Sequence, residues 1–316
     1  MISPGSQNAE AGLPQVSEAR PLEGLSVGIS VSLDEDSPRY GFSAEEEVNR
    51  AVLRLSDSLL AAGARLVFGH DWRPTGVMSA VARLAVTYDP PPETTRGDRS
   101  KGCRITNLVP WDRKPELPAE LRKDLEQRGI LRIEQISPEE APKFFPEVEL
   151  PNMSKSSKAV FTGVGLIALR RRLAELCDAR ICMGGKSKNY QGFVPGILEE
   201  ALESAKKQDR NCVLLSGLIG GAAGMILRAS RSNNWEELTR LPLPPDVEKE
   251  LGEAFVSFLR QTYKEGTAKF LAAPAMIERS GLEPEDWDRL AQARDIEVVI
   301  ALAIKALRRQ AARHRF

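Results

Sequence analysis

Short apolar runs alternate along most of the chain with longer segments whose apolar residues recur at helical spacing. The short runs are rich in β-branched residues and predict strands at 25–32, 64–69, 104–109, 130–136, 180–183 and 211–215. The longer segments predict helices at 43–62, 76–88, 116–128 and 160–177, then from about 195 and after the loop 216–223. Because buried strands alternate with helices, we expect a Rossmann-like α/β fold, with an open, mainly parallel sheet and helices on both faces.

Local signals place some helix ends. Ser43, followed three residues later by Glu46, has the spacing of a capping box, and Gly63 is of the type that ends a helix. Pro195 suits the first turn of a later helix. The residues between 43 and 63 therefore predict one complete amphipathic helix.

The character of the sequence changes along the chain and predicts its parts. Residues 1–22 are rich in Ser, Pro, Gly, Glu and Gln, which is typical of a disordered leader. Residues 23–235 form the expected ligand-binding domain, in which the less regular 113–155 is expected to be an insertion covering the ligand side. Residues 236–316 predict a C-terminal helical extension, a small bundle or an oligomer interface, with helices near 246–263, 284–293 and 295–313.

Charge and cysteine usage narrow the class of protein. The 316 residues contain 44 Lys and Arg and 44 Asp and Glu, so no net charge attracts nucleic acid or an acidic membrane. No run approaches the roughly 20 apolar residues that cross a bilayer, and no signal peptide pattern opens the chain. We therefore expect a cytoplasmic protein without a membrane contact. Its four cysteines are expected to be reduced, and no metal site is expected, because there are two histidines and no clustered thiols.

Glycines and small polar residues gather where four of the predicted strands end. Because the carboxyl ends of parallel strands meet at one edge of a sheet, we expect a ligand there. Glycine lets the backbone approach a phosphate closely, and the N-terminus of the following helix offers free N–H groups and a partial positive charge. The residues expected to bind the ligand from these strand ends are Gly28, Ser30, Ser32, Gly69, His70, Gly184, Gly185, Lys186, Gly217, Gly220 and Gly221.

Other interpretations of these residues stay open. Glycines at strand ends are common in turns, Lys186 also suits a solvated loop, and His70 also suits a loop position without a ligand. No Walker motif is present and no GxGxxG follows the first strand, so the kinase and ordinary dehydrogenase fingerprints are missing. The lone Gly163-Val164-Gly165 is interpreted as helix packing. The aromatic residues near strand ends either stack on a base or anchor their loops: Trp72, Trp111, Tyr190 and Phe193.

Two segments carry a resemblance to a known group of proteins. Residues 178–186 (DARICMGGK) and 195–202 (PGILEEAL) resemble the SLOG superfamily of Rossmann-like domains, and the strands at 27–30 and 66–69 look like the matching SLOG strands. The resemblance covers about residues 24–232 and is closest to the prokaryotic SLOG clusters. The superfamily includes the LOG cytokinin-activating enzymes, the DNA-processing protein DprA, the TRPM channel sensor domain and the SLOG sensor of Thoeris defence.

The resemblance implies roles for several residues. LOG enzymes cleave a base from a nucleoside monophosphate with a glutamate on the helix after a PGGxGTxxE loop and an arginine on the preceding helix. Glu200 occupies the place of the glutamate, and Arg170 is the matching arginine, with Arg171 the next candidate. Glu200 would stabilise positive charge on the ribose or orient a water, and Arg170 would hold a phosphate. The ligand-binding set implied near them is Pro195, Gly196 and Glu199, although Glu199 and Glu200 also suit a solvated first-turn pair.

The chain departs from the LOG pattern in two ways. Ile197 stands in place of the usual threonine, and nine residues separate the Gly184-Gly185 pair from Pro195-Gly196. The split loop favours the first hypothesis, a module that binds or senses a nucleotide-like or NAD-derived ligand and signals through the extra helices or a homo-oligomer, in bacterial nucleotide signalling or antiphage defence. The second hypothesis is a nucleotide N-glycosidase that releases a base. The third, DprA-like nucleic-acid binding, is disfavoured by the zero net charge and few aromatic residues. No cofactor is expected.

Overall fold

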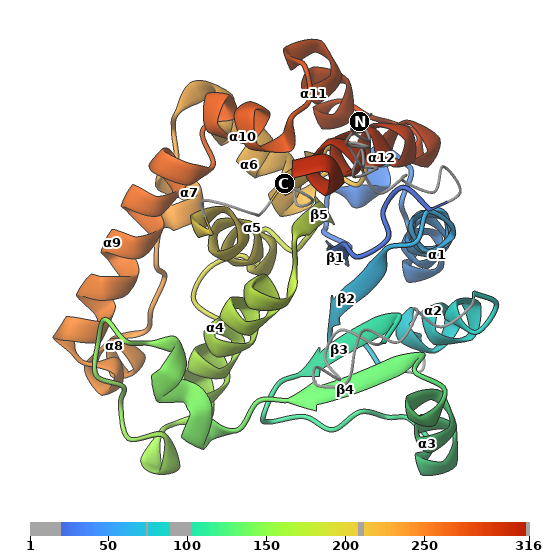
Figure 1. Ribbon diagram of the computed structural model, residues 1–316. Helices are drawn as coiled ribbons and strands as arrows, with labels where there is room; N and C mark the ends of the chain where they lie inside the picture. The colour runs from blue at the N-terminus through green and yellow to red at the C-terminus, as the bar shows by residue number, and fades with distance from the viewer. Residues whose placement is uncertain (1–19, 74, 89–102, 208–211, 314–316) are drawn as a thin grey trace, which may run out of the picture.

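The computed structural model describes residues 20–73, 75–88, 103–207 and 212–313. Within them the chain forms one six-stranded sheet flanked by helices (Figure 1). The expected leader, 1–22, lies outside the described residues except for its last three positions.

All six strands run parallel. They are β1 (Ser26–Ser32), β2 (Arg65–Gly69), β3 (Ile105–Val109), β4 (Leu131–Gln135), β5 (Ala179–Gly184) and β6 (Cys212–Ser216), in the order β4-β3-β2-β1-β5-β6. β5 and the edge strand β6 are buried at every position, as expected for strands covered on both faces. The predicted Rossmann-like α/β fold is confirmed.

The order of the strands creates a switch point at β1. From β1 the chain moves through β2 and β3 to β4 at one edge, and then crosses back to place β5 on the other side of β1. The connections on the two sides of β1 therefore pass over opposite faces. At such a point the loops that follow neighbouring strands diverge, which opens a crevice beyond the carboxyl ends of the strands.

The helices that follow the strands cover the two faces. α1 (Glu45–Ala61), α2 (Met78–Ala85) and α3 (Ala119–Gln127) lie to one side of the sheet, and α4 (Lys158–Leu176) and α5 (Gly196–Lys206) lie to the other (Figure 1). In the described part of the chain, short helical segments connect the larger elements: η1 (Ser37–Tyr40), η3 (Pro138–Phe144), η4 (Met153–Lys155) and α7 (Glu236–Thr239). Within the segment expected to be an insertion, β4 is an edge strand of the sheet.

The C-terminal helices share the core of the sheet. They are α8 (Pro245–Leu251), α9 (Glu253–Phe270), α10 (Ala273–Ser280), α11 (Pro284–Ala291) and α12 (Ile296–Arg313), preceded by α6 (Gly221–Ser232). α10, α11 and α12 pack on β6, α9 packs on α5, and α12 also packs on α1. Their buried side chains belong to the same hydrophobic cluster as the strands. None of the helices in the described part of the chain is both long enough and apolar enough to cross a membrane.

Two details of the predicted helices are wrong. α1 begins at Glu45, and the carboxylate of Glu47 accepts from the N–H groups of Ser43 and Ala44, so the capping pattern is shifted by one residue from Ser43 and Glu46. The single helix expected near 246–263 is divided, because Gly252 has a φ of 79° and separates α8 from α9. A left-handed glycine ends a helix even where the apolar spacing continues.

Candidate functional site

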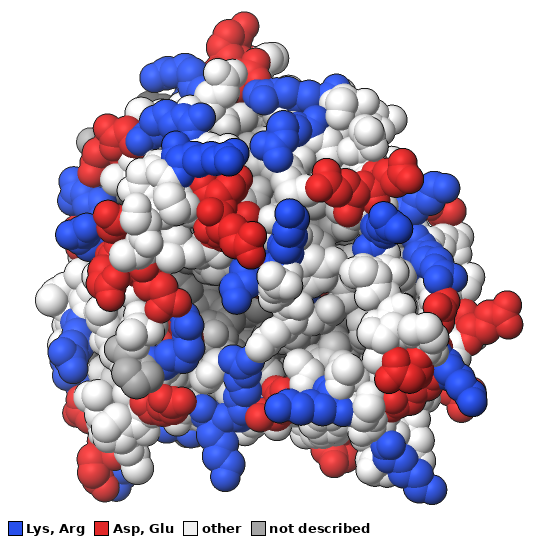
Figure 2. Space-filling model, turned by 180° about the vertical axis from the view of Figure 1, so that it is seen from behind, with Lys and Arg blue, Asp and Glu red and all other residues white. Residues whose placement is uncertain are grey.

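A pocket of about 480 Å³ opens beyond the carboxyl ends of β1 and β2, at the switch point of the sheet. One face of the molecule is hollowed near its centre, and Lys and Arg side chains lie at the rim of the hollow (Figure 2). The volume of the pocket lies within the range of about 300–1,000 Å³ typical of small-molecule sites. Its wall combines apolar side chains of α1, α4 and α5 with charged and polar groups from the strand ends.

The structure brings one part of the predicted site together. The predicted residues that line the pocket are Ser30, Ser32, Gly69, His70, Arg170, Lys186, Gly196 and Glu200. The predicted residues that lie outside its lining are Gly28, Gly184, Gly185, Pro195, Glu199, Gly217, Gly220 and Gly221. Most of the predicted polar side chains therefore line the pocket, whereas most of the predicted glycines do not.

Two cations of the pocket have no carboxylate partner among the described residues. Lys186 is exposed and forms no ion pair there, and Arg113 donates to Gln191 Oε1 at 2.6 Å. Arg73, by contrast, lies 3.1 Å from Glu45 Oε1 and 2.7 Å from Asp71 Oδ1, so its charge is already balanced. Lys186 and Arg113 therefore bring to the pocket two positive charges that no described ion pair neutralises, although the charge of Lys186 also acts on Glu45 of the lining.

Three described helices begin at the pocket, and each has a carboxylate near its start. At α1 and α2 carboxylates accept from backbone N–H groups, whereas the first-turn Glu199 of α5 pairs with Arg170 and Tyr263. The first turn of α1 holds Glu45, Glu46 and Glu47. At α2 the N–H of Val77 donates to Asp71 Oδ2 at 3.2 Å. At α5 no described side chain accepts from the N–H groups of residues 196–198, and Gly196 and Ile197 line the pocket. Since an unoccupied helix N-terminus attracts anions, the start of α5 is the favourable position for a phosphate.

The glycine-rich loop after β6 is closed by another part of the chain. Asp36 Oδ1 accepts from the N–H of Gly221 at 2.9 Å, and the carbonyl of Gly185 accepts from Ala222 at 2.8 Å. A Cβ on Gly220 would lie 2.4 Å from the ring of Tyr40, and one on Gly217 would lie 2.3 Å from the carbonyl oxygen of Ala291. These glycines make room for protein neighbours, and the N-terminus of α6 already has its acceptors.

Gly184 and Gly185 connect β5 to its neighbours behind the pocket. Both have positive φ, 63° and 92°, and the N–H of Gly185 donates to Ser32 at 2.7 Å. A Cβ on Gly185 would lie 2.2 Å from Cγ1 of Ile197. The loop that follows is fixed by Asp34, whose carboxylate accepts from the N–H and the hydroxyl of Ser187 at 2.9 and 2.8 Å. The loop therefore has a defined path to Lys186 and the start of α5.

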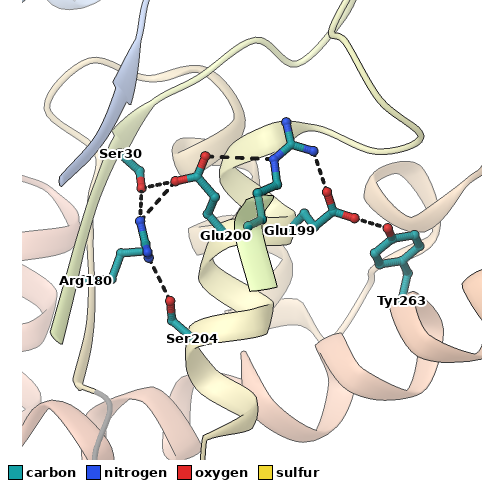
Figure 3. Close-up of polar contacts among 7 residues, drawn as sticks. Ser30, Arg180, Glu199, Glu200, Ser204 and Tyr263 are labelled. Carbon is teal, nitrogen blue, oxygen red and sulfur yellow. Dashed lines mark hydrogen bonds and ion pairs between the residues drawn. The ribbon is translucent and has the colours of Figure 1, made fainter. Parts of the chain in front are cut away.

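Glu200 lines the pocket and is held from behind by a buried arginine (Figure 3). Arg180 is fully buried on β5 and donates to Glu200 Oε2 at 3.1 Å, to the hydroxyl of Ser30 at 2.8 Å and to that of Ser204 at 2.7 Å. Ser30 donates to the same carboxylate oxygen. A Cβ on Gly28 would lie 3.0 Å from Cζ of Arg180, so Gly28 leaves the space that this guanidinium fills.

Glu199 points away from Glu200, into the interior (Figure 3). Its Oε2 accepts from Arg170 and its Oε1 accepts from Tyr263 of α9. Burial and the charge of Glu199 raise the pKa of Tyr263 well above its ordinary value, so the phenol remains a donor. Burial opposes the charge of Arg170, but the carboxylates of Glu199 and Glu200 outweigh it and raise the pKa of the guanidinium. Arg170 thus stays charged at the pocket wall.

His70 presents a half-buried imidazole to the pocket. Burial, followed by the positive charge of Arg113, lowers the pKa of His70, so the neutral ring is favoured near neutral pH. Its buried Nδ1 has no hydrogen-bond partner among the described residues. A bound ligand can supply one. No group of three or more His, Cys, Asp and Glu in the described ranges is placed to hold a metal ion.

The aromatic candidates divide between lining and packing. Tyr190 lines the pocket. Trp72 is buried and donates to Asn107 Oδ1 at 2.8 Å, and Trp111 donates to the carbonyl of Phe161 at 3.2 Å. Phe193 is buried against α4, where a Cβ on Gly163 would lie 2.4 Å from its ring. The last contact agrees with the interpretation of Gly163 as a packing residue.

Sequence reasoning missed two residues that organise the site. Arg180 had a visible signal, because an arginine within the apolar strand 179–184 must be paired when it is buried. Tyr263 had no local signal, since it lies in one of many helical segments and its partner is 64 residues away. Arg73 and Arg113 were also missed, although both follow strand ends closely.

Comparison with known proteins supplies a family. The family model described as SLOG cluster2 matches residues 21–273. The matched range includes the whole sheet, the pocket and α9, and it extends beyond the boundary expected at residue 235. Searches of curated proteins and of solved structures each gave no match.

Proposed function

The chain belongs to the SLOG cluster2 family, and we propose that its pocket binds or senses a nucleotide-like or NAD-derived ligand that carries a phosphate. SLOG domains are a family of nucleotide-related ligand-binding domains, and the pocket at the switch point is of suitable size for such a ligand. The family membership is shown by the match, whereas the nucleotide-like or NAD-derived nature of the ligand is what we propose.

The observation that carries the proposal is the N-terminus of α5. At α1 and α2 carboxylates accept from backbone N–H groups where the helix begins, whereas the first-turn Glu199 of α5 pairs with Arg170 and Tyr263 and leaves the first N–H groups of α5 without an acceptor among the described side chains. Lys186 and Arg170 also line the pocket, and a Cβ on Gly196 would lie only 2.7 Å from Nη2 of Arg170. We place the phosphate at the start of α5, where the N–H groups of the first turn and Nη2 of Arg170, which has no hydrogen-bond partner among the described residues, are donors for it.

The remainder of the pocket suits a nucleoside. Glu200 offers carboxylate Oε1, which lies 3.9 Å from Nε of Arg170 and makes no shorter hydrogen bond among the described residues, as an acceptor for ribose hydroxyls. Leu166, Leu169 and Ile197 supply apolar surface, and Tyr190 supplies an aromatic ring for a base. His70 provides a neutral imidazole as a hydrogen-bonding group.

A sensing role agrees best with how the charges are arranged. Arg170 and Arg180 are each paired with glutamates in the interior, so these four residues form a balanced, rigid network. A base-releasing enzyme remains a second candidate, because one observation favours it: the carboxylate of Glu200 reaches the pocket, where it would face a ribose. DprA-like nucleic-acid binding receives no comparable support from the pocket.

The experiment that tests the proposal is thermal melting against a panel of mononucleotides, NAD, ADP-ribose and cyclic nucleotides, with base release followed by chromatography in the same samples. A ligand at a hundred times its dissociation constant adds about 2.7 kcal/mol to the free energy of unfolding, which raises the melting temperature measurably. A shift without base release supports sensing. Base release that Glu200→Gln abolishes, while binding survives, supports the glycosidase. No shift with any compound contradicts the proposal.

A further inference from the structure

Arg170 has donors that serve two different places. Its Nη1 donates to the buried Glu199, whereas its Nη2 has no hydrogen-bond partner among the described residues and faces Gly196 at the start of α5. The side chain is 8% exposed, so only a small part of the guanidinium reaches the pocket. The fork of an arginine is rigid and planar, and therefore fixing one nitrogen fixes the direction of the others.

Glu199 is in turn fixed by a residue from the C-terminal helices. It is fully buried, and its two carboxylate oxygens have one partner each, Arg170 and Tyr263. Tyr263 is 1% exposed. α9 approaches α5 closely beside this contact, since a Cβ on Gly266 would lie 3.1 Å from the side chain of Leu202. The phenol therefore has little freedom to follow a displaced carboxylate.

We infer that Tyr263 and Glu199 are positioning residues that hold the Arg170 guanidinium toward the phosphate of the ligand. Arg170 then bridges two anions, with Nη1 on Glu199 and Nη2 on the phosphate. The inference rests on the proposed function and deepens it, because it names residues that determine the preference for a phosphorylated ligand. It also makes α9 part of the ligand site, although α9 contributes no residue to the pocket lining.

The chain of contacts explains why a glutamate is buried beside the pocket. A buried carboxylate is unfavourable unless it is paired and hydrogen-bonded, and Glu199 meets both conditions. Glu200, one residue later, has its hydrogen bonds with Ser30 and Arg180, and its Oε1 lies 3.9 Å from Nε of Arg170. The two neighbouring acids of α5 therefore have different roles at the site. Glu200 lines the pocket itself, whereas Glu199 acts on the pocket through Arg170.

The test compares matched pairs of probes that differ by one phosphate. Dissociation constants are measured for adenosine 5′-monophosphate against adenosine, and for nicotinamide mononucleotide against nicotinamide riboside. In Tyr263→Phe we expect the preference for the phosphorylated member to fall about tenfold, which corresponds to about 1.4 kcal/mol, while binding of the nucleosides changes little. A residue that only supports the fold would weaken both members of a pair alike.

Tyr88→Phe is the matched control. Tyr88 also donates its hydroxyl to a carboxylate, that of Asp57, but neither residue lines the pocket. This variant should retain the phosphate preference of the wild type. Should Tyr263→Phe fold poorly, Glu199→Gln keeps the size of the side chain, removes the charge that orients Arg170, and is expected to give the same loss.

The outcomes separate this inference from the proposed function. An unchanged phosphate preference in both Tyr263→Phe and Glu199→Gln would overturn the positioning role alone. An equal fall in Tyr88→Phe would also overturn it, because the loss would then follow any broken tyrosine contact. If the wild type itself shows no preference for either phosphorylated probe, the proposed phosphate site fails, and the positioning role fails with it.

Discussion

The starts of α5 and α6 have different surroundings. Each helix comes after a buried parallel strand and a pair of glycines, directly at α6 and after the loop 186–195 at α5. At α6, Asp36 accepts from the N–H of Gly221, and Tyr40 lies over Gly220. At α5, residues 196 and 197 face the pocket and no carboxylate accepts from their N–H groups among the described residues.

The comparison teaches that a glycine pair before a helix does not by itself identify a phosphate site. Glycine is needed both where a ligand approaches the backbone and where another part of the protein does. The deciding feature is what accepts from the first N–H groups of the helix. At α6 the acceptor comes from a residue 185 positions earlier in the chain.

The largest expected effect lies on the α5 side. Arg170→Met leaves Glu199 as an unpaired buried carboxylate, and breaking such a pair typically costs about 3–5 kcal/mol. Denaturant unfolding should show this loss, and the double variant with Glu199→Gln should recover most of it, because neither charge then remains. A single variant as stable as the wild type would mean that the buried pair does not hold α4 to α5.

The next effect tests the packing role of the loop before α6. In Gly217→Ala the new methyl group meets the backbone carbonyl of Ala291, which cannot turn aside as a side chain can, so we expect a loss of about 1–3 kcal/mol. Gly224→Ala on α6 is the control: the new Cβ would lie 3.6 Å from Nη1 of Arg228, and replacing a helical glycine should add about 0.5–1 kcal/mol. Thermal unfolding of the two variants should therefore shift in opposite directions. If the two variants were equally stable, Gly217 would not be needed to make room for Ala291, and the packing role of the loop before α6 would be contradicted.

A smaller effect concerns binding without a change in stability. Lys186 lines the pocket and forms no ion pair among the described residues, so Lys186→Ala should weaken a phosphorylated ligand about tenfold, or about 1.4 kcal/mol. Lys188→Ala removes a charge from the same loop outside the pocket lining and should leave affinity nearly unchanged. Isothermal titration measures both. Equal losses would mean that the loop acts through its overall charge and that Lys186 makes no specific contact.

The smallest effect is a pH dependence that comes from His70 in the pocket lining. The pKa of His70 is lowered in the folded protein, so the unfolded chain binds the proton more readily. Stability should therefore be greatest above the ordinary histidine pKa of about 6.5 and should fall as the pH drops from there toward the lowered value. Unfolding measured across this window should give a shallower decline for His70→Gln than for the wild type. Parallel curves would contradict the burial of a neutral imidazole.

The sequence predicted those features that depend on local pattern. Strands buried on both faces appear as apolar runs, and topology then brings residues after neighbouring strands together, which is why Ser30, Lys186 and Glu200 meet at one pocket. The closing of α6 by Asp36 and the contact of Tyr263 with Glu199 join distant segments. Neither contact has a local periodicity or spacing, so neither could be found before the packing of the elements was known.

The most direct test of the phosphate site is backbone amide NMR of the deuterated protein during titration with the panel compound that raises the melting temperature most. The account predicts that the amide resonances of Gly196, Ile197 and Leu198 shift on binding, while those of Gly221 and Ala222 move little. The dephosphorylated form of the same compound should leave the first group nearly unshifted. Large shifts at Gly221 and Ala222 with none at residues 196–198 would contradict the account and would place the phosphate at α6.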